Sequence, residues 1–350
     1  MNNILCQTLN LRYPIIQAPM AGVSTPQLAA AVSNAGALGS IGVGASTAQQ
    51  AEQMIRETLA LTSAPINVNL FCHAPAQRDL ALEQAWIARF QPLFDQYEAS
   101  LPEALSEIYQ TFQDNHAMLE VLLETAPAAV SFHFGLPSAS VVQRLKQRGI
   151  TLLASATSVD EALAIEAAGI DFIVAQGIEA GGHRGIFDAN GDDEQLSTFT
   201  LVQAIRKVSR LPVIAAGGVM DGAGIAGMLK LGVAGVQLGT AFILCPESAA
   251  NAAYRNALTG TASTVMTAAI SGRPARCLTN DFCRLTRDVA RDSIPHYPVT
   301  YALGKALAAA AANKGAHGYG AQWAGQGAAL AREMSAAELI NTLVAEWQAA

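Results

Sequence analysis

The fold is decided by the stretch Phe172-Ile173-Val174-Ala175-Gln176-Gly177-Ile178-Glu179-Ala180-Gly181-Gly182-His183-Arg184-Gly185. It starts as a short apolar run, which is typical of a buried strand, and continues with an amide, several glycines and one histidine. Glycine allows a loop backbone to approach a ligand closely and leaves its N–H groups free to donate. The stretch therefore predicts a strand whose end opens into the binding site of a large polar ligand.

Seven other short apolar runs resemble this strand. Together they predict eight strands, which we place at residues 14–18, 38–42, 66–70, 128–132, 151–155, 171–175, 212–216 and 233–238. Segments of helical length separate most of them; residues 159–168, for example, follow the capping residue Ser158 and end before Gly169. Alternating strands and helices indicate a parallel α/β architecture, and eight such strands predict a TIM (β/α)8 barrel.

Two segments interrupt this repeat. Residues 71–127 stand where a short loop and a helix are expected, and their many helix-forming residues predict a helical insertion after the third strand, near the mouth of the barrel. Residues 245–334 predict a substrate-side addition that covers the active site. The barrel itself is then expected in residues 1–70 and 128–244, with a terminal helix in residues 335–350 packed on it.

The composition argues against several classes of protein. The chain has 350 residues, 51% of them hydrophobic, which is enough to bury one large core. Its net charge of -7, without a cluster of basic residues, argues against a nucleic-acid partner, and no segment has the length and apolar character of a membrane span. Five scattered cysteines and no recognisable secretory signal favour the reducing cytoplasm. The spacing of the histidines predicts no metal site, while a homo-oligomer stays open.

Polar residues and glycines follow several predicted strands. The active site of a TIM barrel lies at the carboxyl ends of its strands, where the carboxamides of Asn69 and Gln176 could meet the edge of a heterocycle. Gly217-Gly218 and Gln237-Leu238-Gly239-Thr240 follow the last two strands, where such barrels commonly bind phosphate. Amides for a ring and glycines for a phosphate suggest flavin mononucleotide (FMN), although glycine pairs also serve simple phosphosugars.

A second group of polar residues lies in the C-terminal addition. Tyr297, Tyr301 and Lys305 recur at a spacing of four, and Pro298 suits the first turn of a helix. The three side chains are therefore expected on one helical face, which suits an anionic substrate. The alternative is a solvated helix face.

The motifs Ala18-Pro19-Met20-Ala21-Gly22, Ala175 through Gly185, Gly217-Gly218 and Gly239-Thr240 resemble those of the nitronate monooxygenases, formerly called 2-nitropropane dioxygenases. The class I branch is the more similar one, because His133 lies within Ser131-Phe132-His133-Phe134-Gly135-Leu136-Pro137 and because the long insertion is present. The resemblance implies an FMN-dependent TIM barrel that oxidises alkyl nitronates, notably propionate 3-nitronate, with molecular oxygen and without reduced nicotinamide. A carbonyl compound and nitrite or nitrate would be the products, and detoxification of a nitro compound would be one purpose.

The resemblance also assigns roles to individual residues. His183 matches the catalytic histidine of the family. The expected substrate contacts are His133, Tyr109, Tyr254, Tyr297, Tyr301 and Lys305. The expected flavin contacts are Ala18, Pro19, Met20, Asn69, Gln176, Gly181, Gly182, Gly217, Gly218, Gln237, Leu238, Gly239 and Thr240.

The role of His183 depends on the form of the substrate. With a neutral nitroalkane, the imidazole would act as a general base, which a pKa of about 6.5 permits near neutrality. With a preformed nitronate, it could instead donate a hydrogen bond to the nitro oxygens. The sequence leaves both roles open.

Three other functions are compatible with the same motifs. NADH:quinone reductases and flavin-dependent enoyl-acyl-carrier-protein reductases resemble the chain at its glycines, and rapid bleaching of bound flavin by NADH would identify either. A phosphate-binding isomerase or lyase without flavin would need the glycine pairs alone, and it would be colourless.

Overall fold

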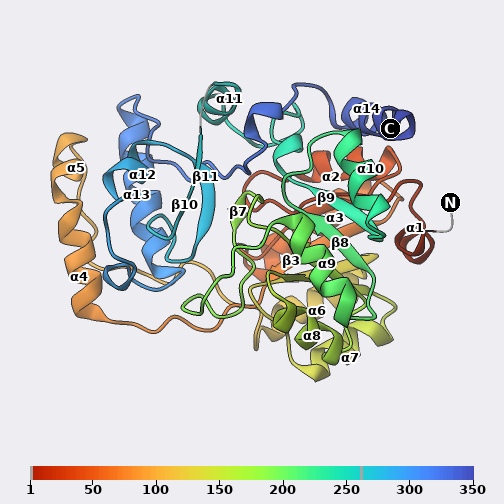
Figure 1. Ribbon diagram of the computed structural model, residues 1–350. Coiled ribbons are helices and arrows are strands. Elements are labelled where there is room, and N and C mark those ends of the chain that lie inside the picture. Colours follow the sequence, from red (N-terminus) through yellow and green to blue (C-terminus); the bar gives the residue numbers. More distant parts are fainter. Residues whose placement is uncertain (1–2, 261–262) are drawn as a thin grey trace.

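Eight parallel strands form one sheet in the computed structural model, which describes residues 3–260 and 263–350 (Figure 1). Their order in space is β1-β9-β8-β6-β5-β4-β3-β2. The two outer strands then meet, because Gln17 N donates to Leu38 O over 2.9 Å and Leu38 N donates to Ile15 O over 2.9 Å. The sheet is thus a closed barrel, which confirms the predicted TIM fold. The strands are β1 (Ile15–Gln17), β2 (Gly39–Gly42), β3 (Ile66–Phe71), β4 (Ala129–His133), β5 (Thr151–Ala156), β6 (Phe172–Gln176), β8 (Val213–Ala216) and β9 (Gly235–Leu238).

Helices surround the barrel in the order in which the strands occur. They are α2 (Pro26–Asn34), α3 (Ala48–Leu61), α6 (His116–Thr125), α7 (Ala139–Gln147), α8 (Val159–Ala167), α9 (Thr198–Val208), α10 (Gly222–Lys230) and α14 (Ala336–Ala349). Capping side chains begin many of them; the hydroxyl of Ser158, for instance, accepts from Glu161 N at the start of α8. The last helix, α14, packs against both α10 and α2 and so completes the ring.

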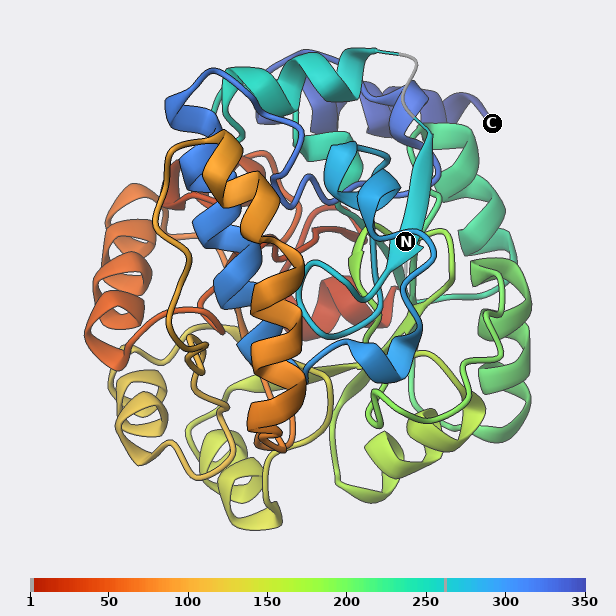
Figure 2. The same ribbon diagram turned by 90° about the vertical axis from the view of Figure 1, so that its left-hand side faces the viewer.

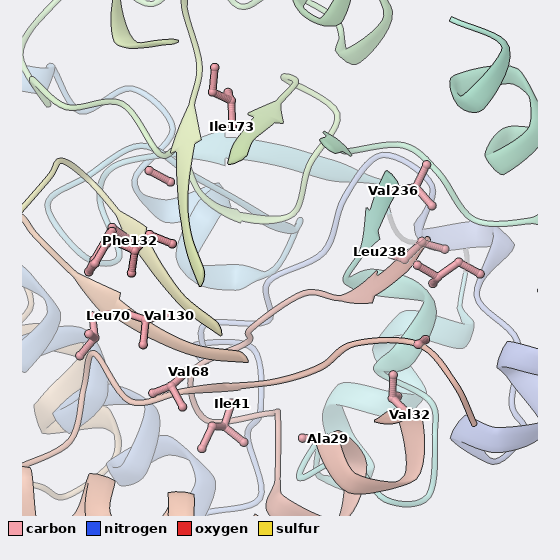
Figure 3. Packing of buried hydrophobic residues seen from close by; sticks show 14 of the residues in the cluster. Ala29, Val32, Ile41, Val68, Leu70, Val130, Phe132, Ile173, Val236 and Leu238 are labelled. Atoms are coloured by element: carbon pink, nitrogen blue, oxygen red, sulfur yellow. The ribbon is translucent and has the colours of Figure 1, made fainter. Parts of the chain in front are cut away.

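The hydrophobic core has two layers because successive side chains of a strand point to opposite faces. Between sheet and helices lie residues such as Val68, Val130, Ile173 and Val236 (Figure 3). Inside the barrel lie their neighbours, for example Phe172. Both layers are almost completely buried, so the barrel is a packed core and not a pore.

A short helix, α1 (Ile4–Leu9), closes one end of the barrel, and the sequence analysis did not predict it. Leu5 and Leu9 pack against the side chains that point into the barrel. Asn3 begins the helix by accepting from Cys6 N over 3.1 Å, and it also donates to Ala234 O over 2.8 Å. Helix α1 therefore covers the amino ends of the strands, on the opposite side of the barrel from their carboxyl ends.

A second lobe covers the carboxyl ends, on the opposite side from α1 (Figure 1). It combines part of the insertion with the C-terminal addition, and it has its own hydrophobic core, in which Trp86, Phe90 and Phe94 pack with Phe282 and Leu303. Figure 2 shows helices of both segments crossing in front of the barrel. Its main elements are α4 (Leu80–Arg89), α5 (Gln91–Gln96), β10 (Thr264–Thr267), β11 (Ala275–Leu278), α12 (Asp281–Leu285) and α13 (Val299–Asn313), with a short 3-10 turn at Arg291–Ser293. Helix α11 (Ala252–Thr259) and the 3-10 turn at Ala328–Leu330 pack together in a separate cluster, and the turn at Thr240–Phe242 belongs to the barrel core.

Two details differ from the expected division of the chain. Helix α6 falls within the expected insertion, yet it packs between α3 and α7 as a regular member of the ring, so the part that leaves the barrel ends before His116. The lobe is also joined to the barrel by a small antiparallel sheet, in which β11 pairs with the two-residue strand β7 (Gly182–His183). No helix within residues 3–260 and 263–350 has both the length and the apolarity needed to cross a bilayer.

Two substitutions in α1 test how much this helix stabilises the barrel. Leu5 is 0% exposed, whereas its neighbour Ile4 is 49% exposed. We expect Leu5→Ala to lower the free energy of unfolding by about 2–5 kcal/mol, because it removes buried carbon atoms and leaves a cavity, and Ile4→Ala to change it by less than about 0.5 kcal/mol. Urea denaturation followed by circular dichroism measures both values. Equal losses would contradict a sealing role for Leu5.

Candidate active site

A cavity of about 970 Å³ lies between the carboxyl ends of the strands and the second lobe. It is lined by every predicted site residue except Leu238. The side chain of Leu238 is 1% exposed and packs in the layer between sheet and helices, since it points away from its neighbour Gln237 (Figure 3). The expected flavin contact at Leu238 is therefore wrong for its side chain.

One end of the cavity presents unused backbone donors. The N–H groups of Gly217, Gly218, Gly239 and Thr240 make no hydrogen bond within the described part of the chain. Gly217 and Gly218 have φ values of 118° and 75°, which favour glycine. Convergent N–H groups of this kind bind anions, so this end suits a phosphate.

Glu179, which the sequence analysis did not single out, lines the same cavity. Its carboxylate accepts hydrogen bonds from Thr198 N over 2.9 Å and from Thr198 Oγ1 over 3.0 Å. Because Thr198 begins α9, the positive end of the helix dipole lies next to this carboxylate and offsets its charge.

The amides near the barrel axis are used in different ways. Gln237 makes no side-chain hydrogen bond with the described residues and is free to meet a ligand. Asn69 donates to Ser131 Oγ over 2.9 Å, which leaves its carbonyl oxygen available. Gln176, in contrast, donates to His183 O over 3.0 Å and accepts from Gly185 N over 2.7 Å. Its carboxamide therefore positions the histidine loop with both of its polar ends.

His183 is held at its backbone and at its ring. Its carbonyl lies 3.2 Å from His133 Nε2 in addition to the Gln176 contact, and its ring Nε2 lies 2.8 Å from Ser271 Oγ. The His183 ring is 4.9 Å from that of Trp323 and 5.5 Å from that of Tyr297, measured between centroids. The His183 imidazole is thus presented to the cavity among aromatic side chains.

The histidines at the site are neutral near pH 7. Burial, with a smaller contribution from nearby His133, Arg273 and His73, lowers the pKa of His183 to about 3. The pKa of His133 is lowered to about 4, again chiefly by burial. The His183 imidazole is therefore unprotonated and able to accept a proton near pH 7, and the same lowered pKa makes it a weaker base than an ordinary histidine.

His133 lines the cavity, but protein groups engage both of its ring nitrogens. Nδ1 lies 2.9 Å from Ser155 Oγ, and Nε2 faces the carbonyl of His183. The carbonyl can only accept, so the proton of neutral His133 lies on Nε2. His133 therefore supports the loop that carries His183, whatever contact its ring also makes with a ligand.

Tyrosines and a lysine form the side of the cavity that belongs to the second lobe. Lys305 Nζ lies 5.0 Å from the centroid of the Tyr109 ring and 5.3 Å from that of the Tyr301 ring. Tyr297 also lines the cavity, but it lies before α13, which begins only at Val299. The prediction that Tyr297 shares one helical face with Tyr301 and Lys305 is therefore wrong. The hydroxyl of Tyr254 donates to the Trp323 carbonyl.

The sequence analysis missed Trp323, which lines the cavity, and Arg273, which is buried behind the lining. Arg273 is 4% exposed, and its guanidinium carbon lies 4.4 Å from the centroid of the Phe134 ring. Burial lowers the pKa of Arg273 to about 10, so it stays positive at pH 7. Trp323 lies in a glycine-rich run, Gly318-Tyr319-Gly320-Ala321-Gln322-Trp323-Ala324-Gly325, which was a usable signal.

Gly181 has a structural reason to be glycine. A Cβ atom there would lie 2.5 Å from Gly325 N and 2.6 Å from the Ala324 carbonyl carbon. The backbone that carries Trp323 therefore passes directly over Gly181. Close packing of two protein segments, rather than of a ligand, accounts for this glycine.

Comparison with known proteins agrees with this geometry. The family model described as nitronate monooxygenase matches residues 2–346. The chain is 58% identical over 344 residues to the nitronate monooxygenase of Paraburkholderia phytofirmans, covering 98% of this chain and 94% of that one. It is 52% identical over 351 residues to the nitronate monooxygenase of Pseudomonas aeruginosa, covering 99% of each.

Solved structures show the same similarity. The nitroalkane oxidase from Streptomyces ansochromogenes superposes with a TM-score of 0.89 and 39% identity, covering 99% of this chain and 98% of that one. FabK from Thermotoga maritima superposes with a TM-score of 0.75 and 27% identity, covering 100% of this chain and 97% of that one. The chain therefore belongs to the nitronate monooxygenase family of oxidoreductases.

Proposed function

We propose that this enzyme binds FMN in the cavity and uses it to oxidise alkyl nitronates with molecular oxygen, propionate 3-nitronate being the expected substrate. The observation that carries the proposal is that different chemical groups line the two ends of one cavity. Unused backbone N–H groups gather at one end, and a neutral histidine among aromatic rings lies at the other. The names of the relatives support the same reaction.

The residues present fit FMN. Gly217, Gly218, Gly239 and Thr240 would hold its phosphate, and Gln237 with the free carbonyl of Asn69 would meet the polar edge of its ring. When bound, FMN supplies a ring that accepts and returns electrons. The five cysteines are all free, which supports the expectation of a reducing, cytoplasmic setting.

The substrate end suits an anion with an attached carbon chain. Lys305 supplies positive charge at the lining, and the buried guanidinium of Arg273 lies behind it over Phe134, while Tyr109, Tyr301 and Trp323 supply apolar surface. The overall reaction balances when one nitronate and one molecule of oxygen give one carbonyl compound and one nitrate ion. It also balances when two nitronates share one molecule of oxygen and give two carbonyl compounds and two nitrite ions. For a neutral nitroalkane, the His183 imidazole would first remove the α-proton.

The absorption spectrum of the purified protein tests the cofactor and the reaction together. We expect flavin bands, FMN in the released cofactor by mass spectrometry, and anaerobic bleaching by propionate 3-nitronate but not by NADH. A colourless protein that takes up no FMN would overturn the proposal in favour of a phosphate-binding isomerase or lyase. Rapid bleaching by NADH alone would favour a reductase.

Replacement of Lys305 tests how the substrate carboxylate is recognised. We expect Lys305→Met to raise the KM for propionate 3-nitronate by about 10-fold or more, because a charge-assisted contact is lost. The KM for an uncharged alkyl nitronate should change by less than about 2-fold. Lys314→Met is the control, since Lys314 follows the last residue of the same helix, α13, but pairs with exposed Glu98. Equal effects of Lys305→Met on the KM of both substrates would show that Lys305 does not bind the substrate carboxylate.

The pH dependence tests whether His183 acts as a neutral base. A base is active above its pKa, and the pKa of His183 is lowered to about 3. For a nitroalkane that stays neutral throughout the range, kcat/KM should therefore keep its plateau as the pH falls from 7.5 to about 5. An ordinary histidine would lose half of its activity near pH 6.5. An inflection at that pH would show that the burial of His183 does not control its protonation.

A further inference from the structure

The two ring nitrogens of His183 have different surroundings. Nε2 lies 2.8 Å from Ser271 Oγ, and the Ser271 side chain is completely buried. Nδ1 makes no hydrogen bond with the described residues, and it is not one of the buried polar atoms that lack a partner, so it faces the open space of the cavity. The atom that can meet a substrate is therefore Nδ1.

Ser271 occupies a rigid position between β10 and β11. Its neighbour Gly272 donates through N to Ala268 O over 2.7 Å, and the Gly272 carbonyl accepts from Arg291 over 2.9 Å. A Cβ atom on Gly272 would lie 2.4 Å from Tyr297 N, so the loop packs tightly against the segment before α13. The hydroxyl is thus held in place by the backbone that carries it.

The hydrogen atoms at Ser271 can be assigned from what each neighbour is able to do. Besides His183 Nε2, the hydroxyl oxygen lies 3.2 Å from Arg273 O, which can only accept, and 3.4 Å from Arg273 N, which can only donate. If the hydroxyl donates to Arg273 O, its oxygen accepts from a proton on His183 Nε2. This arrangement satisfies the Ser271 hydroxyl, the Arg273 carbonyl and His183 Nε2, and it still holds when His183 takes up a second proton on Nδ1. In the opposite arrangement the hydroxyl donates to an unprotonated Nε2 and the ring proton lies on Nδ1, so that hydrogen bond breaks as soon as His183 takes up a second proton.

We propose that Ser271 is a positioning residue that holds the proton of neutral His183 on Nε2 and leaves Nδ1 as an acceptor facing the substrate. The inference rests on the proposed function and separates the two roles left open for His183. An unprotonated Nδ1 cannot donate to the oxygens of a preformed nitronate. It can take the α-proton of a nitroalkane: the C–H bond breaks, its electron pair forms the C=N bond of the nitronate, and the imidazolium retains the proton.

Nuclear magnetic resonance tests the assignment without any reaction. With 15N-labelled histidine, His183, identified by the loss of its signals in His183→Asn, should show a protonated Nε2 and an unprotonated Nδ1 at pH 7. Ser271→Ala should shift the ring towards a mixture of the two tautomers, and Ser271→Thr, which keeps a hydroxyl, should restore it. Ser155→Ala is the matched control, because Ser155 contacts His133 and should leave the His183 tautomer unchanged. A proton on Nδ1 in the unmodified protein would overturn the inference.

Kinetics of the holoenzyme test the consequence. Ser271→Ala should lower kcat for a neutral nitroalkane by about 10-fold or more and change kcat for the preformed nitronate of the same compound by less than about 2-fold. Equal losses with both substrates would mean that Ser271 supports only the structure. An enzyme inactive on every nitronate would refute the proposed function, while the tautomer measurement would still decide the role of Ser271.

Discussion

The carbonyl group of His183 accepts from Gln176 Nε2 at the end of β6 and faces His133 Nε2 at the end of β4. The next residue, Arg184, is 1% exposed; its guanidinium donates to Gln176 O over 2.9 Å and pairs with Asp193 over 2.8 Å. A buried charge with partners missing would be costly, so this loop has few alternative conformations. The strand β7, which contains His183, also pairs with β11 of the second lobe. The same short piece of backbone therefore positions both the barrel side and the lobe side of the cavity.

The positive groups of the site have two effects. Lys305 lines the cavity and favours an anion there, whereas the charge of buried Arg273 contributes to the low pKa values of His73, His133 and His183. Positive charge around the site therefore favours an anion and keeps the histidines neutral. The carboxylate of Glu179 also lines the cavity, but it is bound at the start of α9.

The sequence was informative where a local pattern determines the structure. The apolar runs placed β3 and β6 to within one residue at each end, because a buried strand needs consecutive apolar side chains. Helix α1 was missed, since six residues are too few to show a helical period. Ser271 was missed because its contact with His183 spans 88 residues of sequence. Tyr297 was placed on the wrong element because spacing alone does not show where a helix begins.

The route of the chain limits how the second lobe can move. Its first segment leaves the barrel after β3 and returns before α6, and its second leaves after β9 and returns before α14, which completes the ring. Four covalent connections therefore join lobe and barrel, with β7 and β11 paired between them. A lobe on a single connection could turn freely about it, whereas any displacement of this one has to change the backbone at all four connections and at the β7–β11 pairing.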